Sequence, residues 1–173
     1  RFPDYAPNWD QVQALITPKT RMIIVNSPHN PTGSLMTAVD REKLANLLKG
    51  TDIVVLSDEV YEHILFDGEQ HASLCGHAEL AQRSIVVSSF GKTYHITGWK
   101  IGYVVGPAEL MAEFRKVHQF NVFTVHTPSQ LALAEYMQDA SRHLGLAAFY
   151  QEKREFFRSL MAATPKPPVG RFR

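Results

Sequence analysis

The sequence has little that would suit secretion, membrane insertion or nucleic-acid binding. It contains one cysteine, Cys75, among 173 residues, so an internal disulfide framework is excluded and a reducing, cytoplasmic setting is expected. No run of 18 apolar residues occurs, which argues against a membrane span. Residues 1–5 do not begin a secretory signal with an apolar segment. The formal net charge of +1 gives no electrostatic reason to expect a nucleic-acid partner.

The chain also lacks a recognisable metal-ligand pattern, although it has 8 histidines. No two of them have the helical i, i+4 spacing that, with a third ligand, is typical of a zinc site. We therefore interpret the histidines as ordinary surface or core residues and predict no metal site. No internal repeat or low-complexity linker occurs, so the length and the 45% hydrophobic content suggest one globular unit with a real core.

Short apolar runs alternate with amphipathic segments along the chain. We predict strands at residues 21–26, 53–56, 84–89 and 101–105. We predict helices at residues 9–16, 37–49, 108–120, 128–137 and 144–163. The continuous apolar run at 21–26 is typical of a strand buried on both faces. The alternation predicts an α/β fold with a central, mostly parallel sheet and helices on both faces.

Polar residues that can carry chemistry follow three of the predicted strands. Asn30 lies in a turn after the first strand, Asp58 follows the second, and Ser89 and Lys92 follow the third. Ligands of open α/β sheets bind beyond the carboxyl ends of the strands. This shared location predicts a single site.

Each of these residues also has an ordinary structural interpretation. A lysine on a partly buried loop can act as a neutral amine and form a Schiff base, but a lone lysine such as Lys92 is more often solvated. Asp58 follows four aliphatic residues, where a carboxylate is costly unless it is paired, although aspartate also caps turns. Tyr61 can reach the same pocket or simply pack, and Asn30 can serve a turn alone.

Ser89 and Lys92 form a Ser-x-x-Lys pair, and Lys100 follows eight residues after Lys92. A hydroxyl and a cation near backbone donors suit a phosphate group. Penicillin-binding proteins also contain Ser-x-x-Lys, but the Ser-Asp-Asn and Lys-Thr-Gly elements that accompany it there are missing.

Four segments occur in a recognisable order: 30–33 (NPTG), 57–61 (SDEVY), 88–93 (SSFGKT) and 97–103 (TGWKIGY). With them, the sequence resembles the large domain of the class I/II aminotransferases, the fold-type I enzymes that depend on pyridoxal 5′-phosphate (PLP). The variants SPHNP, SDEVYEH and GWK, the last in place of the commoner GWR, most resemble the methionine and kynurenine aminotransferase branch. The resemblance extends from about Trp9 to Ala163.

The resemblance assigns a role to each candidate residue. Lys92 would hold PLP as a Schiff base, and Asp58 would pair with the pyridine nitrogen and keep it protonated, so that the ring acts as an electron sink. Asn30 and Tyr61 would hydrogen-bond the phenolic oxygen, and this favours its anionic form. Once the amino acid displaces Lys92, the free amine can move the proton away from the substrate's Cα.

The remaining cofactor contacts fall on Ser89 and Lys100, which would bind the phosphate. Most of the family has arginine at the position of Lys100, and lysine keeps the charge but loses the bidentate geometry. By resemblance, the protein is an aminotransferase that moves an amino group from an L-amino acid (methionine, aromatic or kynurenine-type) to a 2-oxo acid. It would act as a homodimer, because family active sites lie at a dimer interface.

The resemblance also predicts what the sequence does not contain. The 29 residues before Asn30 hold neither the Gly-rich phosphate-binding turn nor the stacked aromatic residue of the family. We expect residues 1–163 to be an incomplete PLP-binding large domain and residues 164–173 a Pro-rich tail, with the small domain absent. Three functions therefore stay open: an aminotransferase, a PLP-dependent carbon–sulfur lyase or aminocyclopropane-carboxylate synthase on the same fold, and a truncated non-catalytic fragment.

Overall fold

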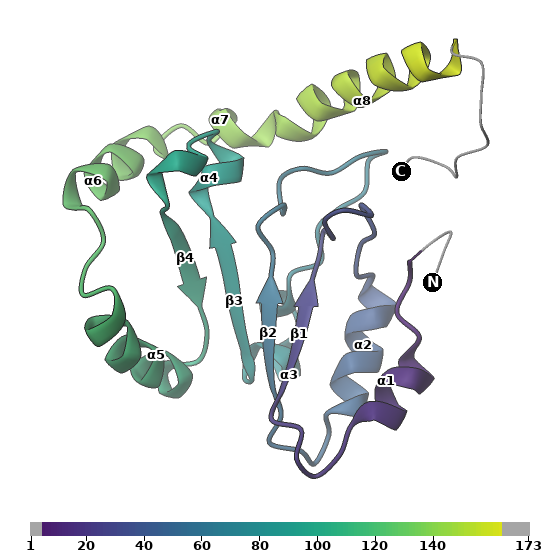
Figure 1. Ribbon diagram of the computed structural model, residues 1–173, viewed down its shortest axis with the longest axis vertical. Coiled ribbons are helices and arrows are strands. Elements are labelled where there is room, and N and C mark those ends of the chain that lie inside the picture. The colour runs from purple at the N-terminus through teal and green to yellow at the C-terminus, as the bar shows by residue number, and fades with distance from the viewer. Residues whose placement is uncertain (1–4, 164–173) are drawn as a thin grey trace.

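A computed structural model describes residues 5–163 and has a four-stranded sheet at its centre (Figure 1). Its strands are β1 (Met22–Asn26), β2 (Val54–Asp58), β3 (Ser84–Ser89) and β4 (Gly102–Val105). Its α-helices are α1 (Trp9–Leu15), α2 (Ala38–Leu47), α3 (Ala78–Ala81), α4 (Phe90–Thr93), α5 (Ala108–Asn121), α6 (Thr127–Tyr136), α7 (Ser141–Leu144) and α8 (Leu146–Ala162). Two 3₁₀ turns complete it, η1 (Leu74–Gly76) and η2 (Thr97–Trp99). The predicted tail, residues 164–173, lies outside the described residues.

The strands lie in the order β1-β2-β3-β4, with β1, β2 and β3 parallel and β4 antiparallel to β3. The register pairs Asn26 with Asp58 and Asp58 with Val87. The carboxyl ends of the three parallel strands therefore meet at one edge, which is uppermost in Figure 1. The predicted α/β fold with a mostly parallel sheet flanked by helices is confirmed.

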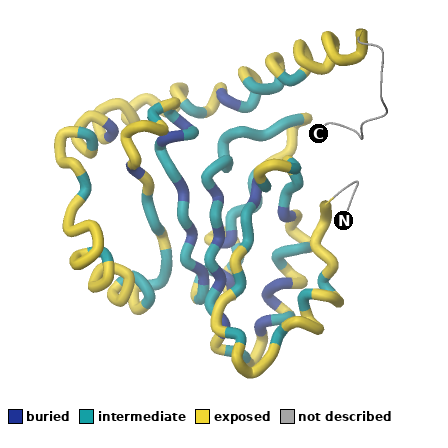
Figure 2. Tube along the Cα trace, in the orientation of Figure 1, coloured by how far each residue is buried: buried dark blue, intermediate teal, exposed yellow. Residues whose placement is uncertain are grey.

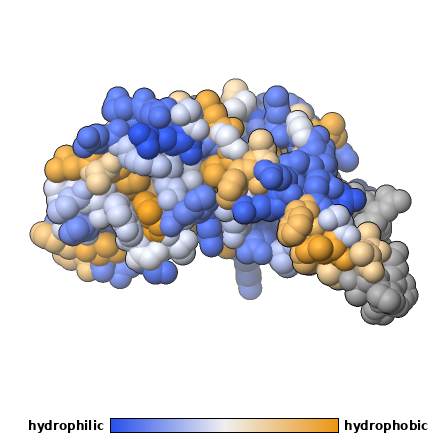
Figure 3. Space-filling model, turned by 90° about the horizontal axis from the view of Figure 1, so that it is seen from above, coloured by the Kyte–Doolittle hydropathy of each residue, from blue (hydrophilic) through white to orange (hydrophobic). Residues whose placement is uncertain are grey.

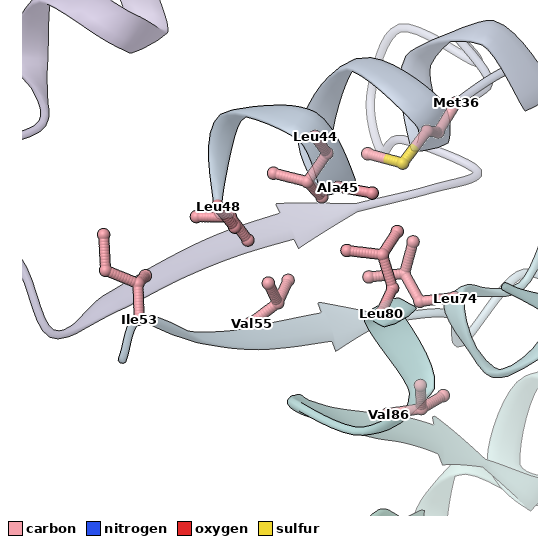
Figure 4. Packing of buried hydrophobic residues seen from close by; sticks show 9 residues of the cluster. All are labelled: Met36, Leu44, Ala45, Leu48, Ile53, Val55, Leu74, Leu80 and Val86. Atoms are coloured by element: carbon pink, nitrogen blue, oxygen red, sulfur yellow. The ribbon is translucent and has the colours of Figure 1, made fainter. Parts of the chain in front are cut away.

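The hydrophobic core lies between one face of this sheet and helix α2 (Figure 4). Leu44, Ala45 and Leu48 from α2 and its C-terminal end pack against Val55 and Val86 from the strands. Leu74 and Leu80, from η1 and α3, close the end of the cluster nearer to β3. Burial of these aliphatic side chains holds α2 and α3 against the sheet.

Helix α2 begins where the sequence predicts. Thr37 is its N-cap, and a capping box joins the Thr37 side chain to the Asp40 backbone N–H and the Asp40 side chain to the Thr37 N–H. Asp40 Oδ1 also accepts a hydrogen bond from Trp9 Nε1 at 2.8 Å, which fixes α1 against α2. Gly50 follows the helix with a φ of +71°, a conformation that favours glycine.

One prediction about the strands is wrong. Strand β1 is not buried on both faces, because Met22 is 46% and Ile24 is 69% exposed, and α2 covers only the side of Ile23 and Val25. The predicted helix at 144–163 corresponds to α8 (Leu146–Ala162), and Leu144 instead ends the short helix α7. The short elements η1, α3 and α4 are too brief for apolar periodicity to reveal them.

The C-terminal helices are much less buried than the sheet and α2 (Figure 2). Apolar residues on α5 and α6 are exposed, among them Val117 at 67%, Phe120 at 89% and Leu131 at 66%. Figure 3 shows hydrophobic side chains gathered at the α5–α6 end of the upper surface. Among residues 5–163, no helix combines the length and apolar character that crossing a membrane requires.

The core predicts a strong dependence of stability on Leu44, which is fully buried. Replacement by alanine should lower the free energy of unfolding by about 2–5 kcal/mol, because it removes buried methyl groups and leaves a cavity. The matched control is Val39→Ala on the same helix, where the side chain is 61% exposed and the change should stay within about 0.5 kcal/mol. Urea unfolding measures both variants, and equal losses would contradict this core.

Candidate active site at the carboxyl edge of the sheet

Five of the six predicted site residues lie at the carboxyl ends of the parallel strands or in the segments that follow them. Asp58 is the last residue of β2, and its Oδ1 accepts a hydrogen bond from the Val60 N–H at 3.2 Å. On β1, Asn26 donates from Nδ2 to the Asp58 carbonyl at 3.0 Å, and its Oδ1 accepts the Asn30 N–H at 3.1 Å. Asn26 therefore joins the turn that carries Asn30 to the strand that carries Asp58.

Three predicted residues are in direct proximity above this edge. Asn30 Nδ2 donates to Tyr61 Oη at 3.3 Å, and Lys92 Nζ lies 5.8 Å from the centre of the Tyr61 ring. A cation at this distance interacts favourably with the face of an aromatic ring. The structure thus brings together an amide, a phenol and an amine from three segments that are far apart in the sequence.

Ser89 sets the position of Lys92. It ends β3 and caps the short helix α4, since its Oγ accepts the Gly91 N–H at 3.0 Å. The same hydroxyl donates to the Ile101 carbonyl at 3.4 Å. Lys92 lies one position after Gly91, so its backbone follows directly from this cap.

Glycine is required where β4 approaches β3. A Cβ on Gly102 would clash with the Ser88 carbonyl oxygen, so any side chain here would push the two strands apart. The motif glycine at 102 therefore permits the close antiparallel pairing that holds Ser89 beside Gly102.

Lys100 is placed differently from the other predicted residues. It is exposed, follows η2 and has a φ of +56°. Among the hydrogen bonds of residues 5–163, none joins its side chain to the other five candidates. Its link to the site is through the backbone, because Ser89 Oγ contacts the adjacent Ile101 carbonyl.

A buried carboxylate lies beneath this edge, and sequence reasoning did not single it out. Glu59 is 2% exposed, and its carboxylate accepts hydrogen bonds from Ser57 Oγ at 2.9 Å and the Leu74 N–H at 3.0 Å. His71 Nε2 lies 2.6 Å from Glu59 Oε2. Burial alone would raise the pKa of Glu59, but the hydrogen bonds from His71, Leu74 and Ser73 outweigh it and hold the pKa below the ordinary 4.5.

A second acidic residue, Glu62, joins the same segment to β3 and β4. Its Oε1 accepts hydrogen bonds from Ser88 Oγ at 2.8 Å and from the Tyr103 hydroxyl. Burial and the bond to Glu62 raise the pKa of Tyr103 to about 12. Tyr103 therefore remains a protonated donor across the neutral range.

Ligand atoms of Glu59, Glu62 and His71 lie within 4.8 Å of one another. Both oxygens of Glu59 and Oε1 of Glu62 already accept hydrogen bonds from protein groups, so these carboxylates form two neighbouring polar clusters. The alternation of side chains along a strand is the sequence signal that could have indicated that Glu59 is buried. Val55, Ser57 and Glu59 are all buried, which places Glu59 on the core side of the sheet, while Leu56 and Asp58 are turned to the other side.

The cluster around Glu59 predicts a loss of stability at low pH. Because the folded pKa of Glu59 is depressed, its contribution is fully present above pH 4.5 and disappears as the pH falls through the folded value. Glu59→Gln should lower the free energy of unfolding by about 1–3 kcal/mol near pH 7 and by progressively less in acid. Denaturant unfolding from pH 7 to pH 3 measures this, and a constant difference between variant and unsubstituted protein would exclude it.

Known proteins are similar to this chain in sequence and in architecture. Residues 2–171 match the family model for aminotransferase class I and II. The chain is 47% identical over 154 residues to the methionine aminotransferase of Escherichia coli K12, covering 88% of this chain and 40% of that protein. It is 35% identical over 140 residues to kynurenine–oxoglutarate transaminase 1 of Rattus norvegicus, covering 81% of this chain and 33% of that protein.

Solved structures agree. The crystal structure of YbdL from Escherichia coli, described as having a methionine aminotransferase function, superposes with a TM-score of 0.91 at 44% identity, covering 94% of this chain and 43% of that one. N-Succinyldiaminopimelate aminotransferase from Mycobacterium tuberculosis superposes with a TM-score of 0.78 at 38% identity, covering 91% and 40%. The chain spans 40% or less of the length of the curated relatives named above. On the extent of these matches, the chain belongs to the class I and II aminotransferases.

Proposed function

We propose that the protein is a PLP-dependent aminotransferase that moves an amino group from an L-amino acid to a 2-oxo acid. The observation that carries the proposal is the meeting of Lys92, Tyr61 and Asn30 above the end of β2, where Asp58 lies. An amine can form the Schiff base, a carboxylate can face the ring nitrogen, and a phenol and an amide can donate to the phenolic oxygen, so the residues fit the cofactor. Family membership supports the same cofactor.

Bound PLP supplies an aldehyde that condenses with amines and a ring that withdraws electrons from the substrate's Cα. Asp58 would hold a proton at the ring nitrogen, because a carboxylate stabilises the positive charge there. Tyr61 Oη and Asn30 Nδ2 would donate to the phenolic oxygen. Lys92 Nζ would hold the cofactor and, once released, take the proton from the substrate's Cα.

Phosphate binding falls to Ser89 and Lys100 in this proposal. The Ser89 hydroxyl lies at the start of α4, beside the backbone N–H groups of that turn. Lys100 lies in the connection between η2 and β4 and would add a positive charge from there. Its exposed side chain is free to turn toward a bound phosphate. We propose that residues 1–163 belong to the cofactor-binding large domain of such an enzyme.

We further propose methionine, aromatic and kynurenine-type amino acids as donor substrates. The support is the 47% identity to a methionine aminotransferase and the 35% identity to a kynurenine–oxoglutarate transaminase. We propose a homodimer, because the exposed apolar residues of α5 and α6 suit a protein interface. The single cysteine supports the reducing, cytoplasmic setting that we propose for it.

Lys92 provides the direct test. Addition of PLP to the purified protein should produce a visible absorbance band, and borohydride reduction should leave PLP attached to Lys92 in a peptide mass map. Lys92→Ala should abolish both signals, since within residues 5–163 Lys92 is the lysine that lies over the Tyr61 ring. Lys116→Ala is the matched control, because Lys116 is an exposed lysine on α5 whose described contact is an ion pair with Glu113.

Product analysis then decides the reaction. With methionine and a 2-oxo acid, an aminotransferase forms the 2-oxo acid of methionine and the new amino acid in equal amounts. Release of ammonia and a thiol would instead establish the carbon–sulfur lyase. A band that survives Lys92→Ala, or no band in the unsubstituted protein, would refute the proposed cofactor site.

A further inference from the structure

We propose that Glu62 is a positioning residue for the cofactor site: its carboxylate ties the turn that carries Tyr61 to β3, which ends at Ser89, and to β4, which begins two residues after Lys100. The proposal rests on the proposed function, because it concerns the same site. Glu62 itself is directed to the core side of the sheet and would not touch the cofactor.

The first observation is that one oxygen of Glu62 joins two strands. Ser88 and Tyr103 are paired residues of β3 and β4, and both donate to Glu62 Oε1. The next step of this ladder pairs Ser89 with Gly102. Glu62 is therefore hydrogen-bonded to Ser88, the residue before Ser89, and Ser89 caps the helix α4 that carries Lys92.

The second observation concerns the turn on the other side. The Glu62 N–H donates to the Glu59 carbonyl at 2.9 Å, and the Ile64 N–H donates to the Tyr61 carbonyl at 2.8 Å. Tyr61 lies within the first of these hydrogen-bonded turns and accepts the hydrogen bond of the second. Holding Glu62 at the strands therefore limits the movement of the Tyr61 backbone, and with it the hydroxyl that contacts Asn30.

The bonds to Glu62 are suited to a fixed support. Hydrogen bonds to a carboxylate are roughly twice as strong as those between neutral groups. The pKa of Tyr103 is raised to about 12, so its hydroxyl does not lose the donated proton at working pH. The Glu62 side chain is 20% exposed, so water competes only partly for its oxygens.

Hydrogen exchange of the cofactor-free protein tests the support directly. Glu62→Ala should accelerate exchange of the amides of residues 60–64 by about tenfold or more, because two charge-assisted bonds are lost. Glu62→Gln keeps an acceptor oxygen but loses the charge, so its exchange should be slower than in Glu62→Ala and faster than in the unsubstituted protein. Glu69→Ala is the control, since it removes an exposed carboxylate from the same connecting segment and should change nothing.

The PLP-loaded protein gives a second readout. When Tyr61 is no longer held, the pH midpoint of the visible band should rise by about one unit in Glu62→Ala, with PLP still attached to Lys92. Tyr103→Phe and Ser88→Ala, which each remove one donor, should give smaller shifts in the same direction. Glu62→Gln keeps an acceptor oxygen and should give a smaller rise than Glu62→Ala.

The outcomes separate the two proposals. Absence of a Lys92-dependent band in the unsubstituted protein refutes the proposed function, while the exchange comparison still decides whether Glu62 holds the turn. Unchanged exchange in Glu62→Ala overturns the inference. Faster amide exchange in Glu62→Ala with an unchanged midpoint of the visible band also overturns it, because the role would then be purely structural. An equal midpoint shift in Glu62→Gln and Glu62→Ala overturns it as well, because charge alone would then matter.

Discussion

The parallel pairing of β1, β2 and β3 is the constraint on which the rest of this structure depends. It aligns three strand ends at one edge, and the register sets Asn26 beside Asp58 and Asp58 beside Val87. No single segment of the chain contains enough groups to build a site. The turn after β1 supplies Asn30, the turn after β2 supplies Tyr61, and the helix after β3 supplies Lys92. These groups meet because the hydrophobic burial of Val55 and Val86 against α2 fixes the strands beneath them.

Alternation along the strands then separates two kinds of polar chemistry. Along β2 and the residue that follows it, Ser57 and Glu59 face the core side and Asp58 the opposite side. The core side holds the carboxylates of Glu59 and Glu62, which accept hydrogen bonds from Ser57 Oγ, the Leu74 N–H and Ser88 Oγ and so act as internal support. The opposite side presents groups with spare hydrogen-bonding capacity. A single-residue change of register would exchange these two roles, which makes the register as important to the site as the residues themselves.

The sequence predicted the strands well because each is a short apolar run that ends in turn-forming residues. Residues 84–89 coincide with β3, and Thr37 caps α2 as expected. The candidate residues were found because strand ends and familiar motifs point to the same edge. The Glu59–His71 pair was not found, since the two residues are 12 apart and meet only through a loop that has no periodic pattern. Exposure of Ile24 was also beyond prediction, because an apolar run indicates a strand but not what covers it.

The segment between β2 and η1 connects the site to the rest of the molecule. It begins with Glu59 and Glu62, which attach it to the sheet, and farther along Arg41 Nη1 donates to the Ser73 carbonyl at 2.9 Å and joins it to α2. At its outermost point Asp67 forms an ion pair with Arg154 of α8, and the Arg154 guanidinium lies 4.5 Å from the centre of the Phe66 ring.

The contact of this segment with α8 differs in strength from its contacts with the sheet. Asp67 is exposed, so its ion pair is screened by water and contributes little stability. Glu59 is buried, and breaking its bonds leaves an uncompensated charge in the interior. The segment is therefore held firmly at the end that carries Tyr61 and loosely at the end that meets α8. Helix α8 also contacts the loop after Lys92, because Tyr150 Oη lies 3.1 Å from His95 Nε2, so α8 reaches the site region by a route that does not pass through Asp67.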